Sequence, residues 1–226
     1  LGVWAITRGG SGSGTSITPI TSSEPSTTDV PVSVGTDATD SGNAGTFVIT
    51  APEASPSSLA PRDTGVPETA AAGDRLVADD TGVFTVSVPN DFEVDTSPVD
   101  ANGEQIPQVM AASDLAAFRN DFVTVGYIVN ALPAHVASTP HDAIVLAAPR
   151  DQDCVSLSTE VDIDTAVGPA VLQTAQGCGP ESGSVAVVAL VDGQSGRAFV
   201  VYAQGRGNIE SVRTLAQTVL ESVYLS

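Results

Sequence analysis

Two sets of alternating carboxylates are the residues of this chain that could bind a metal ion. Glu160, Asp162 and Asp164 form one set, and Asp91, Glu93 and Asp95 form the other. Alternation places each set on one face of an extended segment, and clustered oxygens are what Ca²⁺ requires. Neither set matches the EF-hand loop, and the solvated face of a strand explains both. We therefore predict no metal, with Glu160, Asp162 and Asp164 as the weak calcium candidates.

The bases that a hydrolase would need are His135 and His141, the chain's two histidines. Neither lies near a Gly-x-Ser-x-Gly elbow, and the nearest string, GQSG at 193–196, falls in a predicted turn. A pocket that gathers His141, Asp142 and a serine would support a hydrolase. The sequence has no phosphate loop, dinucleotide fingerprint or zinc spacing, so we predict no catalytic residue and no cofactor.

Cys154 and Cys178 are the only cysteines, and the segment between them is typical of a hairpin. Two runs of alternating residues, 155–163 and 170–176, flank Gly168 and Pro169, which favours a strand, a turn and a strand. The ends of a hairpin lie close together, so the two cysteines are well placed to form a disulfide. Two separate buried thiols are the alternative.

The chain is strongly acidic, with 27 acids against 8 bases and a net charge of −19. Every base is arginine. Negative charge repels phosphate backbones and anionic headgroups, so the sequence disfavours nucleic acid and direct membrane docking. A soluble surface in an organism that uses few lysines explains this charge without a cation site.

Composition divides the 226 residues into three parts. Residues 1–8, LGVWAITR, are interpreted as the end of a transmembrane or signal segment, or as a plain disordered terminus. Residues 9–78 are rich in Gly, Ser, Thr and Pro and are predicted to be a disordered tether, with a β-prone run at 46–50. Residues 79–226 form the predicted globular domain. One disulfide in such a chain favours an extracytoplasmic location.

Periodicity within the globular part predicts an α+β fold, an antiparallel sheet flanked by helices. Strands are predicted at 82–92, 123–132 and 198–204, with a fully buried one at 184–191, and helices at 113–122, from about 139 and after Asn208. The last helix carries an apolar stripe from Ile209 to Val223, which must lie on a sheet. Asn102 and Gly103 are typical of a hairpin turn.

From about Val83 to the C-terminus, the chain resembles the PsbP/Mog1-like α/β/α domains found outside the membrane in actinobacterial proteins. The resemblance lies in GVFTVSVPNDFEV, IPQVMAASDLAAFRNDFVTVGYIV, AFVVYAQGRGNIESVRTLAQTVLESV and the cysteine pair. The sequence departs from that group at 171–173, where VLQ replaces aromatic residues. The resemblance implies an extracytoplasmic sensory, binding or accessory module, often tethered to the membrane, and it carries over no catalytic residue.

We therefore expect a non-catalytic extracytoplasmic binding or accessory domain of a membrane-anchored cell-envelope protein. Its expected partner is a protein or small molecule at the envelope, and its membrane contact is expected only through an upstream anchor. A cell-envelope hydrolase of unrecognised type and a calcium-dependent surface module are the alternatives.

Overall fold

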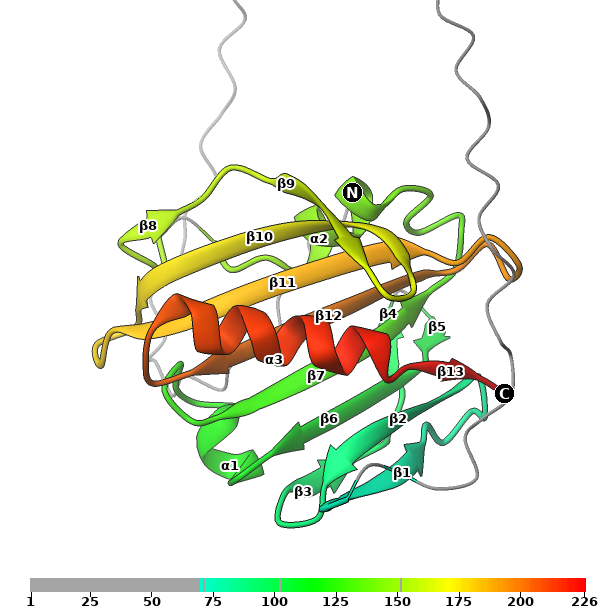
Figure 1. Ribbon diagram of the computed structural model, residues 1–226, viewed down its shortest axis with the longest axis horizontal. Coiled ribbons are helices and arrows are strands. Elements are labelled where there is room, and N and C mark those ends of the chain that lie inside the picture. Colours follow the sequence, from blue (N-terminus) through cyan, green and yellow to red (C-terminus); the bar gives the residue numbers. More distant parts are fainter. Residues whose placement is uncertain (1–69, 71, 102, 151) are drawn as a thin grey trace, which may run out of the picture. The chain divides into compact units, whose positions relative to one another are not determined.

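The computed structural model describes residues 70, 72–101, 103–150 and 152–226 (Figure 1). The predicted terminal segment 1–8, the β-prone run 46–50 and most of the predicted tether 9–78 lie outside the described residues. No helix in the described ranges is long and apolar enough to cross a membrane.

An eight-stranded antiparallel sheet forms the centre of the fold (Figure 1). In spatial order its strands are β3 (Glu93–Asp95), β6 (Gln108–Ala112), β7 (Gly126–Leu132), β12 (Ala198–Gly205), β11 (Gly183–Val191), β10 (Gly168–Cys178) and β8 (Ser156–Leu157), with β9 (Val161–Thr165) also paired to β10. Helices lie on both faces, so the predicted fold class is confirmed.

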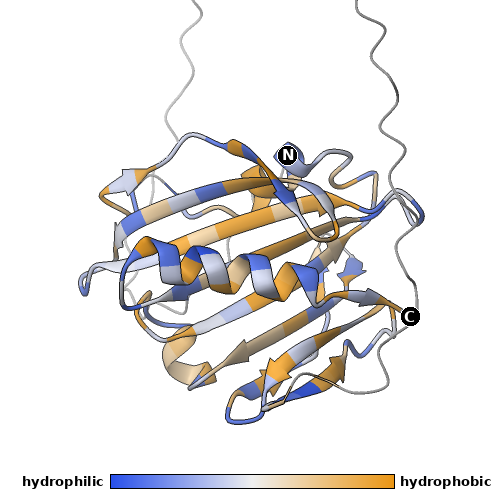
Figure 2. Cartoon of the chain, in the orientation of Figure 1, coloured by the Kyte–Doolittle hydropathy of each residue, from blue (hydrophilic) through white to orange (hydrophobic). Residues whose placement is uncertain are grey.

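Strand β11 is the buried strand that its continuous apolar run predicts. Ala186 and Val188 lie in the core on one face of the sheet, and Val185 and Val187 lie in the core on the other. Figure 2 shows the hydrophobic residues gathered along β11 and its neighbour β12. Because both faces of this strand are covered, its sequence does not alternate between apolar and polar residues.

One face of the sheet is covered by α3 (Ile209–Glu221) and by a second, three-stranded sheet. The helix begins after Asn208, whose side chain accepts the backbone N–H of Ser211, as its cap signal predicts. The second sheet has the order β1 (Asp74–Ala78), β2 (Phe84–Pro89) and β13 (Tyr224–Leu225). Side chains of β2 and α3 share one hydrophobic core.

The opposite face carries α1 (Leu115–Phe118), α2 (Pro140–Ala147) and the hairpin of β4 (Val99–Ala101) and β5 (Glu104–Ile106). Helix α2 begins with a capping box in which Thr139 and Asp142 bond to each other's backbone. Gly103, between β4 and β5, has a φ of 87°, which fits the predicted turn.

Two predicted boundaries are wrong. Strand β1 lies inside the segment assigned to the tether, so the folded domain begins before residue 79. Its five residues have no strong strand signal, and they become a strand by pairing with β2. Helix α1 ends at Phe118 rather than at residue 122, and Asp114, not Ser113, is its cap. The chain turns early because the Asp121 carboxylate accepts hydrogen bonds from the backbone N–H groups of Val123 and Thr124.

Candidate functional site

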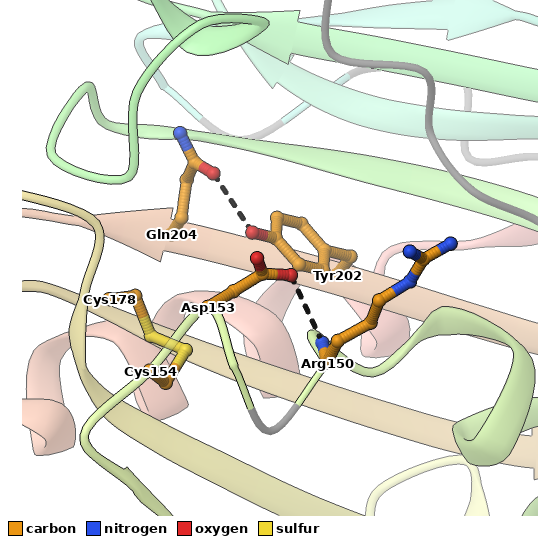
Figure 3. Close-up of a disulfide and its surroundings, with 6 residues drawn as sticks. All are labelled: Arg150, Asp153, Cys154, Cys178, Tyr202 and Gln204. Carbon is orange, nitrogen blue, oxygen red and sulfur yellow. Dashed lines mark hydrogen bonds between the residues drawn. A yellow bond between two sulfur atoms is a disulfide. The ribbon is translucent and has the colours of Figure 1, made fainter. Parts of the chain in front are cut away.

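The candidate site lies at the edge of the main sheet that β8, β9 and β10 form. Cys154, just before β8, and Cys178, the last residue of β10, are joined by a disulfide with a Cα–Cα distance of 3.9 Å. Figure 3 shows this disulfide and a nearby hydrogen bond, in which the backbone N–H of Arg150 donates to the Asp153 carboxylate with an N···O distance of 3.3 Å. The structure thus contains the predicted cysteine pair, and the disulfide attaches the short strand β8 to its neighbour.

The hairpin within the cysteine segment turns two residues earlier than predicted. Ala166 and Val167 form the turn, while Gly168 and Pro169 are the first residues of β10. The hydroxyl of Thr165 donates to the carbonyl of Gly168 over 2.7 Å, which closes the turn. Pro169 is tolerated in the strand because its missing N–H is not needed at a position without a ladder hydrogen bond.

The side chains of β9 alternate between the two faces of the sheet. Asp162 pairs with Val171, which packs among residues of the α2 core. Ile163 pairs with Ala170, which lies in the α3 core. Paired residues of antiparallel strands share a face, so the carboxylates of β9 lie on the α2 face and its apolar side chains on the α3 face.

A groove of about 330 Å³ lies between the first turn of α2 and the β9–β10 hairpin. We call it the β9 groove; it is lined by Pro140, Asp162, Ile163, Asp164, Pro169, Ala170 and Val171. Both carboxylates are on exposed residues of β9. In the part of the chain that the structure describes, neither carboxylate has an ion pair or a hydrogen-bonded side-chain partner.

The third predicted calcium candidate, Glu160, is directed elsewhere. Its carboxylate lies 2.5 Å from Nδ1 of His141 on α2. The hydrogen bond and the negative charge of Glu160 raise the pKa of His141 above its usual value. Glu160 therefore joins α2 to the start of β9 and does not converge with Asp162 and Asp164. No group of three or more histidines, cysteines or carboxylates within the described ranges is placed to hold a metal ion.

The upstream carboxylates are also separate from one another. Glu93 accepts the backbone N–H of Leu115 at the start of α1, and Asp95 forms an ion pair with Arg119. Hydrogen bonds from Ser97 and the charge of Arg119 outweigh the effect of burial and lower the pKa of Asp95. These groups position α1 against β3.

The residues of the hydrolase alternative take part in different interactions. The Asp142 carboxylate accepts hydrogen bonds from Ser138 and Thr139 at the start of α2, and these bonds lower its pKa. His141 contacts Glu160, and His135 lies 2.7 Å from Glu104. Ser138 and Asp142 are thus in contact, but among the described residues no hydrogen bond joins His141 to either of them.

Sequence reasoning missed the two prolines that line the β9 groove. Pro140 falls at the predicted start of a helix and Pro169 in the predicted turn, and nothing in their local sequence indicates that they line a common groove. The groove depends on where α2 lies relative to β9, which is a property of the tertiary structure. The alternation of Asp162 and Asp164 was the one available signal.

The fold and the site together define a small α+β domain with helices on both faces of an antiparallel sheet and a disulfide at one edge. No protein-family model matches the chain, and no curated protein matches it. Among solved structures, the Ran-binding protein Mog1 of Saccharomyces cerevisiae is similar at 12% identity, over 67% of this chain and 95% of Mog1, with a TM-score of 0.44. The PsbP protein (CyanoP) of Synechocystis is similar at 13% identity, over 72% and 98%, with a TM-score of 0.43. These likenesses concern the fold alone.

Proposed function

We propose that this domain is a non-catalytic binding module, which takes a ligand or protein partner at the β9 groove. The observation that carries the proposal is the pair of exposed carboxylates, Asp162 and Asp164, which line a groove beside apolar residues. Binding sites commonly combine an apolar surface with a few polar groups that fix orientation. The groove offers both kinds of surface at one sheet edge.

The non-catalytic part of the proposal is supported by the roles of the nearby ionisable groups. Asp142 caps α2, and the carboxylate of Glu160 pairs with His141. A general base must reach the proton that it abstracts, and these two acidic groups already hold helix α2 in place.

The proposed location is the outer side of the cell membrane, where a disulfide persists. Cys154 and Cys178 support this location, and the Gly-, Ser-, Thr- and Pro-rich composition of residues 9–69, before the described domain, supports attachment through a tether. Attachment to the membrane through an upstream anchor is part of the same proposal.

Site-specific photo-crosslinking in the envelope of the producing cell tests the binding function. A photoreactive residue replaces half-buried Pro140, which lines the groove, and a matched control replaces exposed Thr214 on α3. We expect a discrete crosslinked species from position 140 and none from position 214. Equal crosslinking from both positions, or none from either, would contradict the proposal.

A substrate panel of esters, amides, phosphoesters and glycosides tests the non-catalytic part. We expect no turnover above that of a His141→Ala variant. Turnover that this substitution abolishes would establish the hydrolase alternative instead.

A further inference from the structure

Strand β9 lies at the outer edge of the main sheet, with β10 as its partner on one side (Figure 1). The two-residue turn makes Thr165 and Gly168 the first hydrogen-bonded pair of this hairpin. Alternation then places Asp162 and Asp164 at the positions without ladder bonds. Pro169, which has no N–H, lies opposite Asp164 and fits this pattern. The backbone N–H and C=O groups of both aspartates therefore point away from β10.

A strand added to this edge would meet a different chemistry on each face. On the α2 face its side chains would lie beside the carboxylates of Asp162 and Asp164 and over the β9 groove. On the α3 face they would lie beside Val161, which is 46% exposed, and half-buried Ile163. Side chains of a strand alternate between faces, so a matching partner alternates basic and apolar residues.

Charge complementarity favours a basic partner over an acidic one or a second copy of this chain. The chain carries a net charge of −19, and β9 itself contributes two carboxylates and no base. Three arginines of the described ranges form ion pairs with carboxylates outside β9: Arg119, Arg206 and Arg213. Two copies joined through this edge would place four carboxylates of β9 side by side.

We propose that the outer edge of β9 docks an extended protein segment of alternating basic and apolar residues, which adds a strand to the main sheet. The inference rests on the proposed binding function and names its partner class. Backbone hydrogen bonds to Asp162 and Asp164 provide the affinity common to added strands, and the alternating side chains provide the specificity. Basic side chains enter the β9 groove, while apolar ones cover Val161 and Ile163.

The test titrates the ¹⁵N-labelled full chain with a short synthetic peptide of alternating arginine and valine. One control peptide has the same sequence with alternate backbone nitrogens methylated, so that it cannot pair along one edge. The other control has the same composition with all arginines before all valines. We expect the alternating peptide to shift the amide resonances of β9 and to bind about tenfold more tightly than either control, as the loss of one or two hydrogen bonds implies.

Two sets of variants separate strand pairing from general attraction to an acidic protein. Asp164→Pro removes one outward N–H together with one carboxylate, and we expect its affinity to be about fivefold weaker than that of Asp164→Asn, which removes the carboxylate charge alone. The double variant Asp162→Asn, Asp164→Asn removes two negative charges from β9. The control double variant Glu181→Gln, Glu210→Gln also removes two negative charges, at positions outside β9. We expect the first pair to weaken binding at least about fivefold, and the control pair less than about twofold, at physiological salt.

Equal binding of all three peptides, or resonance shifts spread over the whole surface, would overturn the strand-docking proposal. The peptide controls act on the unaltered protein, so this outcome does not depend on whether any variant folds. Photo-crosslinking from position 140 with equal binding of the three peptides would leave the binding function in place and remove only its partner class. If photo-crosslinking gave no specific product and the three peptides bound equally, both the binding function and the strand-docking proposal would be wrong.

Discussion

Loss of the disulfide should destabilise the domain by an amount that the sequence separation sets. Cys154 and Cys178 are 24 residues apart, and opening a loop of that length costs about 3.5 kcal/mol in the chain-entropy account. For a domain of this size, the unfolding free energy changes by about 2 kcal/mol per molar urea. Replacing both cysteines by alanine should therefore lower the urea midpoint by about 2 M.

Within the folded domain, the loss of the disulfide should loosen the edge of the sheet at β8 more than its centre. Strand β8 pairs with β10 through only two residue pairs, Leu157 with Ala175 and Ser156 with Gln176, so it depends on the disulfide more than β11 does. Urea titration followed by circular dichroism measures the midpoint, and reduced wild-type protein is the matched control. A shift below about 0.5 M, or a different shift for the reduced wild type, would show that the disulfide does not stabilise the domain by closing this loop.

Three further predictions concern single side chains. Gln204 is fully buried, and its amide donates to backbone carbonyls between residues 118 and 124; Gln204→Leu leaves these carbonyls unsatisfied and should cost about 3 kcal/mol, which calorimetry should show as a Tm about 10 °C lower. Glu160 raises the pKa of His141, so this pair contributes its full stability below the ordinary histidine pKa and loses it as the pH rises through the raised value. The Tm of the wild type should therefore fall as the pH rises above about 6.5, and Glu160→Gln should remove this fall. Thr139→Ala removes the N-cap of α2 and should lower the free energy of unfolding by about 1 kcal/mol in urea titration, whereas an unchanged midpoint would show that this cap is dispensable.

Local patterns predicted the elements that carry their own signal. The apolar run of β11 indicated a strand covered on both faces, and the stripe of α3 indicated a helix on a sheet. In both cases the burial follows the sequence closely: Ala216 and Leu220 of α3 are fully buried, as are Val185 and Val188 of β11. These elements were predictable because strand length and helical period are local properties of the chain.

Elements that depend on distant partners were not predictable in this way. Strand β1 forms by pairing with β2, and α1 ends early where its following turn meets the buried Gln204 amide. The β9 groove needs the first turn of α2 beside a hairpin that follows it by some twenty residues. The sequence pattern indicated the alternating carboxylates, but not that Glu160 would turn to His141 while the other two line the groove.

Hydrogen–deuterium exchange of the free protein measures whether the outer edge of β9 is open. The amides of Val161 and Ile163 face β10 and should be protected, whereas those of Asp162 and Asp164 face outward and should exchange roughly a hundredfold faster. We expect this alternation between neighbouring amides when NMR resolves the exchange residue by residue. Equal protection of all four amides would show that the edge is already covered and cannot dock a further strand.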